Sequence, residues 1–180
     1  NKKKFAERFL KENKSVKTVV EKTGKFSGRL RKQSTKYLAG EKTKEALYKE
    51  NGCVFRLNID NVYFSSRLSS ERKEIAGKVK RGESVLVMFA GVAPFPIVIA
   101  KNLKAKVVYS NEINREANKY AELNIGLNKV KGRVFLLPGD VKKIADKITN
   151  KKLSPPTRDL ARVINYQSYS LPQSRSPTPK

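Results

Sequence analysis

Histidine is absent from this chain of 180 residues, and cysteine occurs only once, as Cys53. These absences exclude Ser-His and Cys-His catalysis, most zinc sites and an internal disulfide framework. A lone cysteine fits a reducing compartment, so we expect a cytoplasmic protein in which Cys53 is a small buried side chain. Any acid–base chemistry must use carboxylates, lysines, tyrosines or groups of a bound substrate.

Long apolar spans and acidic residues are also scarce. The most apolar stretch, residues 85–100, is interrupted by Gly91, Pro94 and Pro96, so we expect no membrane-spanning helix and no membrane partner. The 16 acidic residues stand against 40 lysines and arginines, which leaves a net charge of +24. An excess of that size favours a polyanionic partner, and we expect nucleic acid.

Three segments differ in composition and pattern. Residues 1–50 are basic and polar, and they predict a small α+β domain with a helix near Phe5 and Phe9 and a strand near 16–20. Residues 51–150 contain the regular apolar segments of a larger domain. Residues 151–180 are rich in proline and serine, which predicts a disordered tail.

Strands and helices alternate through the second half of residues 51–150. The pattern predicts strands at 84–89, 106–110 and 133–137, followed by helices at 95–103, 114–126 and 141–148. Such alternation is typical of an α/β fold with a parallel, doubly wound sheet, which binds ligands at the carboxyl ends of its strands. Ahead of it, a hairpin or two short strands are expected within 53–65, and then a helix that is capped at Ser69 or Ser70 and ends at Gly82.

The sheet predicted in this way lacks a fourth strand. From about Leu153 onward the sequence shows little periodicity, and no further strand is evident. We therefore expect an incomplete sheet and a truncated or frame-shifted C-terminal end.

The three predicted strand ends carry residues suited to a nucleoside. The first strand runs into a turn at Gly91, Glu112 follows the second strand, and Asp140 follows the third. An acid 21 residues after a glycine turn is placed to accept hydrogen bonds from ribose hydroxyls, and Asp140 is placed to bind an adenine amine. The alternatives are a structural glycine and an ordinary helix cap at Asp140. Because a pyrophosphate needs more glycines than this turn has, S-adenosylmethionine is the better candidate.

Four segments resemble the archaeal-type tRNA (guanine-N1)-methyltransferases, which act on the guanine just 3′ of the anticodon, at position 37. The segments are "ENGCVFRLNIDNVYFSSRLSSER" (50–72), "MFAGVAPFPI" (88–97), "NEIN" (111–114) and "LNIGLNKV" (123–130). The resemblance extends over roughly residues 15–148. It implies a Rossmann-like class I methyltransferase domain after a small RNA-binding domain, with S-adenosylmethionine as cofactor and tRNA as partner. We expect a monomer.

The resemblance also implies roles for individual residues. Glu71 matches the general base that takes the proton from guanine N1, although a first-turn helix acid is the plainer interpretation. Arg31, with Arg29 as its competitor, matches an arginine that stabilises charge on guanine O6. Tyr63 and Arg67 match residues that line the target site. The expected cofactor-binding residues are Phe89, Ala90, Gly91, Val92, Glu112, Ile113, Asp140 and Val141; no metal site is expected.

Two departures from the family pattern bear on activity. Val87 stands where many relatives carry an aspartate, and residues 149–180 contain no Asn-Pro segment. We therefore expect low or no methyl transfer unless the absent part of the sheet is supplied. The alternatives are the wyosine-pathway enzyme that transfers the aminocarboxypropyl group of the same cofactor, and a non-catalytic RNA-binding fragment.

Overall fold

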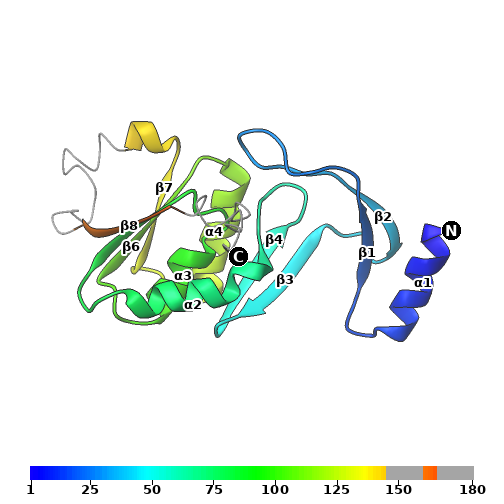
Figure 1. The fold of residues 1–180 in the computed structure, drawn as a ribbon, viewed down its shortest axis with the longest axis horizontal. Coiled ribbons are helices and arrows are strands. Elements are labelled where there is room, and N and C mark those ends of the chain that lie inside the picture. Colours follow the sequence, from blue (N-terminus) through cyan, green and yellow to red (C-terminus); the bar gives the residue numbers. More distant parts are fainter. Residues whose placement is uncertain (145–159, 166–180) are drawn as a thin grey trace, which may run out of the picture.

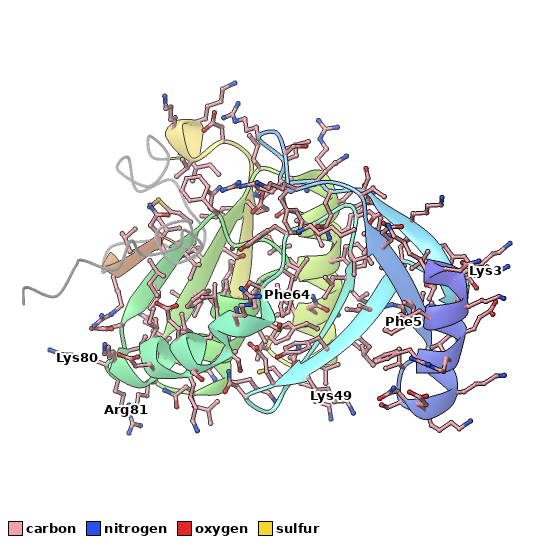
Figure 2. All side chains as sticks on the ribbon, turned by 45° about the vertical axis from the view of Figure 1, so that its right-hand side comes forward. Lys3, Phe5, Lys49, Phe64, Lys80 and Arg81 are labelled. Atoms are coloured by element: carbon pink, nitrogen blue, oxygen red, sulfur yellow. The ribbon has the colours of Figure 1, made fainter. Side chains whose placement is uncertain are left out.

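A computed structural model of the chain describes residues 1–144 and 160–165. Figure 1 shows three successive parts: helix α1 with a small antiparallel sheet, a central hairpin, and a parallel sheet flanked by helices. Among the described residues, no helix is long and apolar enough to cross a membrane. Basic side chains such as Lys3, Lys49, Lys80 and Arg81 are exposed on separate segments, so the positive charge is spread over the molecule (Figure 2).

The N-terminal part confirms the helix and the strand that the sequence predicts there. Helix α1 (Lys2–Glu12) begins at Asn1, whose side chain accepts a hydrogen bond from the backbone N–H of Lys3. The helix packs against the strand pair β1 (Thr18–Lys22) and β2 (Thr35–Gly40) through Ala6, which is fully buried. Residues 23–34 connect these two strands.

The central hairpin corrects the expectation of two strands within 53–65. Strand β4 (Cys53–Asn58) pairs antiparallel with β3 (Glu45–Glu50), which the sequence reading missed, and residues 59–65 form no strand. The tight turn between the strands falls at Asn51 and Gly52, both with positive φ. Such a turn matches the twist of a hairpin, and asparagine and glycine adopt its backbone angles most readily.

Asn124 of helix α4 (Arg115–Leu127) and Asn128, the C-cap of that helix, bind the edge of β4 that is not paired with β3. The Asn124 side chain accepts from the Arg56 N–H (2.7 Å) and donates to the Arg56 carbonyl (3.1 Å). Asn128 makes the same pair of bonds to Val54, at 2.8 and 2.6 Å. Because each amide uses one N–H as donor and its oxygen as acceptor toward β4, the two side chains replace a neighbouring strand. They join the hairpin to the parallel sheet.

The parallel sheet confirms the predicted fold class. Its strands are β5 (Ser84–Met88), β6 (Val107–Glu112), β7 (Val134–Pro138) and β8 (Leu160–Asn165), in the spatial order β7-β6-β5-β8. From β5 the chain adds β6 and then β7 on one side, whereas β8 lies on the other side of β5, so the strand order reverses at β5. In open α/β sheets, ligands bind at the carboxyl ends of the strands next to this point.

Strand β8 shows that the expectation of no fourth strand is wrong. Residues 160–165 pair parallel with β5, so that Asn165 lies opposite Met88 at the carboxyl end of the sheet. This strand falls within 151–180, so the tail is not wholly irregular. Residues 145–159 and 166–180, which include part of the helix predicted at 141–148, lie outside the described residues.

The helices around the sheet have slightly different bounds from those predicted. Helix α2 (Ser69–Lys78) follows a short 3-10 turn at Ser66–Leu68, so neither Ser69 nor Ser70 caps it, and it ends before Val79 rather than at Gly82. Helix α3 (Pro94–Lys101) starts with prolines near its N-terminus, where a missing N–H is tolerated. Its apolar residues are buried in the main core together with those of β5.

Candidate functional site

The turn after β5 has an unusual backbone. Phe89, Gly91 and Ala93 all have positive φ, at 57°, 58° and 65°. Only glycine adopts this region without strain, and a Cβ at Gly91 would lie 3.3 Å from the Tyr63 carbonyl oxygen. Strained residues that cluster in this way are common at ligand-binding turns. The Gly91 turn is therefore specialised beyond a simple connection between strand and helix.

The carboxylate of Glu112 is fixed beside this turn. One oxygen accepts a hydrogen bond from the Gly91 N–H (2.8 Å), and the other accepts from the Asn114 N–H (2.8 Å). Asn114 in turn caps helix α4, because its side chain accepts from the Glu116 N–H (3.0 Å). Each carboxylate oxygen keeps capacity for a further donor, as two ribose hydroxyls require.

Asn111 of β6 and Asp140, which follows β7, lie at the third of the predicted strand ends. Asn111 donates to the carbonyls of Leu137 (2.8 Å) and Gly139 (3.0 Å), which fixes the backbone that leads into Asp140. The Lys142 N–H donates to the Asp140 carboxylate, which is also paired with Arg29. The hydrogen bond from Lys142, and then the Arg29 guanidinium, hold the pKa of Asp140 below its usual value, so this acid is ionised at neutral pH.

Residues 23–34, here called the strap, reach from the N-terminal part to these strand ends. Its tip is a tight turn closed by the Arg31 N–H and the Gly28 carbonyl (3.2 Å) and by a bridge between Ser27 and Lys32. The Leu30 carbonyl accepts a hydrogen bond from the Asn114 side chain (3.1 Å). Under the tip lies a cavity of about 50 Å³, lined by Arg29, Leu30, Arg31, Tyr63, Phe89, Gly91, Glu112, Ile113, Asn114 and Ala117.

This cavity gathers many of the predicted site residues. Six of them line it: Arg31, Tyr63, Phe89, Gly91, Glu112 and Ile113. Asp140 is linked to it through Arg29. Ala90 and Val92 are buried in this structure, with the Ala90 N–H bonded to the Asn111 carbonyl (2.9 Å) and the Val92 carbonyl to the Asn124 side chain (3.2 Å). Arg67, Glu71 and Val141 are not among the lining residues.

The sequence reading did not select Asn114 or Leu30 as site residues. Asn114 is the first residue of the helix predicted at 114–126, and an asparagine at a helix start, where it can act as the cap, was the available signal. Leu30 contributes through its backbone, which no residue-type pattern reveals. Val87, where an aspartate was expected from the family pattern, is fully buried in the main core.

Glu71 lies in the first turn of α2, which is fixed by the next residue. Arg72 is fully buried, pairs through two nitrogens with Glu50 of β3, and donates to the Ser65 carbonyl (2.9 Å). Its guanidinium also lies over the rings of Phe64 and Phe95. This one side chain therefore joins the hairpin, the segment that follows Tyr63, and the start of α2.

Glu71 itself is half-buried and has a raised pKa. Desolvation is the main cause, the nearby Glu74 adds to it, and Arg72 opposes it. A carboxylate whose proton affinity is raised is a better general base than an ordinary surface glutamate. Among the described residues, no group of three or more Cys, Asp or Glu side chains is placed to hold a metal ion.

Comparisons with known proteins show which family the chain belongs to. A family model described as the TRM5/TYW2 methyltransferase domain matches residues 46–156. The chain is 50% identical over 127 residues to a Nanoarchaeum equitans protein named tRNA (guanine(37)-N(1))/4-demethylwyosine(37)-methyltransferase Taw22, covering 71% of this chain and 42% of that protein. It is 43% identical over 139 residues to the Pyrococcus abyssi tRNA (guanine(37)-N(1))-methyltransferase Trm5b, covering 76% and 41%.

Solved structures show the same fold. The structure of a complex of aTrm5 and tRNALeu superposes with a TM-score of 0.69 at 34% sequence identity, over 75% of this chain and 40% of that one. The chain thus spans less than half the length of the relatives that it matches.

Proposed function

The chain belongs to the TRM5/TYW2 methyltransferase family, and from this premise we propose that it transfers a methyl group from S-adenosylmethionine to N1 of guanine 37 in tRNA. The observation that carries the proposal is the cavity that unites the Gly91 turn and Glu112 with Arg31 and Tyr63, the two residue sets expected for cofactor and guanine. The same proposal includes that the protein acts in the cytoplasm and as a monomer.

The residues at the strand ends fit an adenosyl group that carries no phosphate. Glu112 would accept hydrogen bonds from the ribose hydroxyls, and Asp140 would accept one from the adenine amine. The turn at 89–92 would present backbone groups to the amino-acid end. When bound, S-adenosylmethionine supplies an electrophilic methyl group on a sulfonium.

The chain's own residues would carry the proton transfer. Guanine N1 holds a proton that must leave as the new N–C bond forms, and Glu71 is the proposed base. Negative charge then grows on guanine O6, and Arg31 at the cavity wall offers a permanent cation with paired donors. Tyr63 lines the same cavity, and Arg67 lies four residues before Glu71, in the 3-10 turn that leads into α2. Both residues are proposed to line the guanine pocket.

A direct test uses the chain, labelled S-adenosylmethionine and an unmodified tRNA transcript. We expect label at N1 of guanine 37 and none in a transcript with adenine at that position. Glu71→Gln should lower the rate by about 10²–10⁴-fold, the usual contribution of a general base. Glu122→Gln, an exposed glutamate on helix α4, is the matched control and should keep the rate.

Several results would contradict the proposal. Label that is independent of residue 37, or a Glu71→Gln rate equal to that of the control, would each do so. The expectation of low activity rested on an absent fourth strand and on an absent Asn-Pro segment. The structure contradicts the first ground, because β8 is present, and the same assay measures the effect of the second.

The second candidate is the wyosine-pathway transfer of an aminocarboxypropyl group to tRNA. The family description that includes TYW2 favours it as the alternative. Mass spectrometry of the digested product separates the two reactions, because the transferred groups differ greatly in mass. RNA binding without any transfer would instead support a non-catalytic RNA-binding role.

A further inference from the structure

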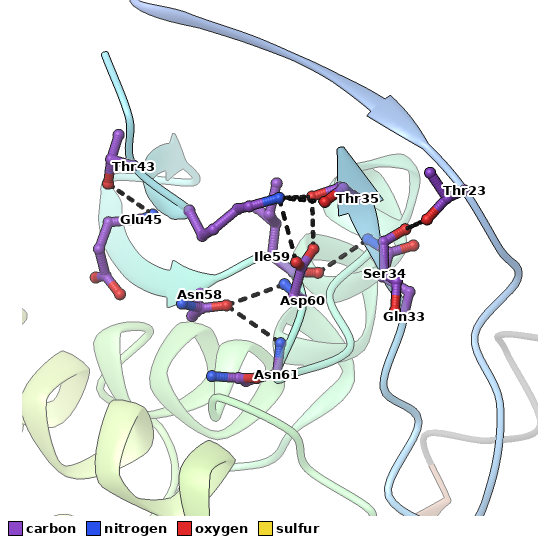
Figure 3. Close-up of polar contacts among 11 residues, drawn as sticks. Thr23, Gln33, Ser34, Thr35, Thr43, Glu45, Asn58, Ile59, Asp60 and Asn61 are labelled. Carbon is purple, nitrogen blue, oxygen red and sulfur yellow. Dashed lines mark hydrogen bonds and ion pairs between the residues drawn. The ribbon is translucent and has the colours of Figure 1, made fainter. Parts of the chain in front are cut away.

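The base of the strap is firmly anchored to the turn that follows β4 (Figure 3). Gln33 donates to the Asp60 carbonyl through its backbone (3.1 Å) and to the Ile59 carbonyl through its side chain (2.9 Å). Thr35 donates to the Asp60 carboxylate (2.7 Å), and Lys44 pairs with the same carboxylate (3.3 Å). These contacts do not involve the tip, so the tip can move while the base stays in place.

The tip is held by weaker contacts. Arg29 donates to Asp140 at 2.5 Å, but its side chain is 68% exposed and that of Asp140 is 24% exposed. Exposed ion pairs contribute little because water screens them. A further contact at the tip is the hydrogen bond from the Asn114 side chain to the Leu30 carbonyl (3.1 Å), and next to the tip the Phe26 ring packs edge-on against the Tyr63 ring. Gly28, with a φ of 66°, provides a flexible joint on one side of the tip.

The closed tip competes with the proposed cofactor. A cavity of about 50 Å³ cannot hold an adenosyl group, since pockets for ligands of that size enclose roughly 300 Å³ or more. The Arg29 guanidinium also donates a hydrogen bond to the Asp140 carboxylate, which is the group proposed to bind the adenine amine. The part of the tip around Arg29 must therefore shift before the adenosyl group can enter.

We propose that Arg29 is a positioning residue that couples cofactor binding to RNA binding. Its guanidinium holds the strap closed on Asp140 until the adenine amine takes that carboxylate, and it is then released to bind an RNA phosphate. This inference rests on the proposed function, because it takes the same cofactor and the same RNA as the ligands.

The composition of the strap identifies the second ligand as a polyanion. Residues 23–34 contain four cations, Lys25, Arg29, Arg31 and Lys32, and no acid. Once Arg29 leaves Asp140, all four charges are available beside the mouth of the cavity. A guanidinium suits both of its partners, since it pairs with carboxylate and with phosphate in the same planar geometry.

Binding measurements with and without the second ligand test this coupling. The probes are S-adenosylhomocysteine and an unmodified tRNA transcript, with affinities measured by calorimetry and filter binding. For the unaltered chain, we expect S-adenosylhomocysteine to tighten tRNA binding by about threefold, the value of one exposed ion pair, and tRNA to tighten S-adenosylhomocysteine binding equally. Arg29→Gln should bind S-adenosylhomocysteine about threefold more tightly by itself, and the coupling should vanish.

Lys25→Gln is the matched control, because it removes one positive charge from the same strap. It should weaken tRNA binding but keep the coupling. Arg29→Lys, which keeps the charge but loses the paired donors, should keep part of it.

The outcomes separate this inference from the proposed function. If the unaltered chain binds no S-adenosylhomocysteine, both fail. If it binds S-adenosylhomocysteine and methylates guanine 37, but Arg29→Gln keeps the coupling or leaves the S-adenosylhomocysteine affinity unchanged, only the role of Arg29 is refuted.

Discussion

At the residue scale, Glu71 links burial to chemistry. Its pKa is raised from the ordinary value of 4.5, chiefly by desolvation, and the proposed base is active only when it is deprotonated. Its neighbour Arg72 opposes the shift and also fixes the helix turn on which Glu71 stands. Burial thus favours protonation of the Glu71 carboxylate. The buried ion pair between Arg72 and Glu50 holds the helix turn that carries Glu71 in place.

The pH dependence of methyl transfer follows from this shift. The rate should fall as the pH is lowered through the pKa of Glu71, at a pH above 4.5, because protonation removes the base. Single-turnover rates measured across a pH series would show this limb. Glu74→Ala should move the limb to lower pH, because the charge of Glu74 is one cause of the raised pKa. An unchanged limb in that variant would argue against Glu71 as the titrating group.

At the element scale, the two asparagines on α4 replace a strand at the edge of β4. Removal of one leaves an N–H and a carbonyl of β4 without that partner. A buried group without a partner costs about 1–3 kcal/mol, and these two groups are only partly buried, so together they cost toward the lower end of that range each. Asn128 is only 3% exposed, so water cannot easily take its place.

We expect Asn128→Ala to lower the free energy of unfolding by about 2–3 kcal/mol, as measured by urea denaturation. Glu122→Ala, an exposed position on the same helix, should change it by less than about 0.5 kcal/mol. Equal stability of the two variants would show that the asparagine bonds do not hold the hairpin to the sheet.

Also at this scale, β8 explains where sequence reading failed. The segment Leu160–Asn165 is six residues long and is surrounded by proline and serine, so its local pattern is weak. Its strand conformation comes from pairing with β5, which is 76 residues away at the Ser84–Leu160 pair. The strands β5, β6 and β7 were predictable because each is a compact apolar run followed by a helix with its own period.

At the scale of the whole molecule, the net charge of +24 should govern the proposed RNA binding. Each phosphate contact releases condensed counterions, so the affinity falls as salt is added. If the four cations of the strap each contact one phosphate when S-adenosylhomocysteine is bound, the tRNA affinity at saturating S-adenosylhomocysteine should fall about a hundredfold between 50 and 200 mM salt. Filter binding over a salt series measures the slope.

Binding of S-adenosylhomocysteine, which carries no net charge, serves as the control for that series and should change little over the same range. A tRNA affinity that does not depend on salt would show that the basic surface is not the RNA-binding surface.

The sequence by itself determined the fold class, the glycine turn, the acids at the strand ends and the preference for a polyanion. Each of these depends on composition or on residues that are close in the chain, and local periodicity and spacing record them. Only the tertiary structure decided that Arg29 pairs with Asp140, which is 111 residues away in the chain, that the strap covers the cavity beside the Gly91 turn and Glu112, and that β8 pairs with β5. The physical reason is that these contacts depend on how separate elements pack, and no local pattern in the chain encodes that arrangement.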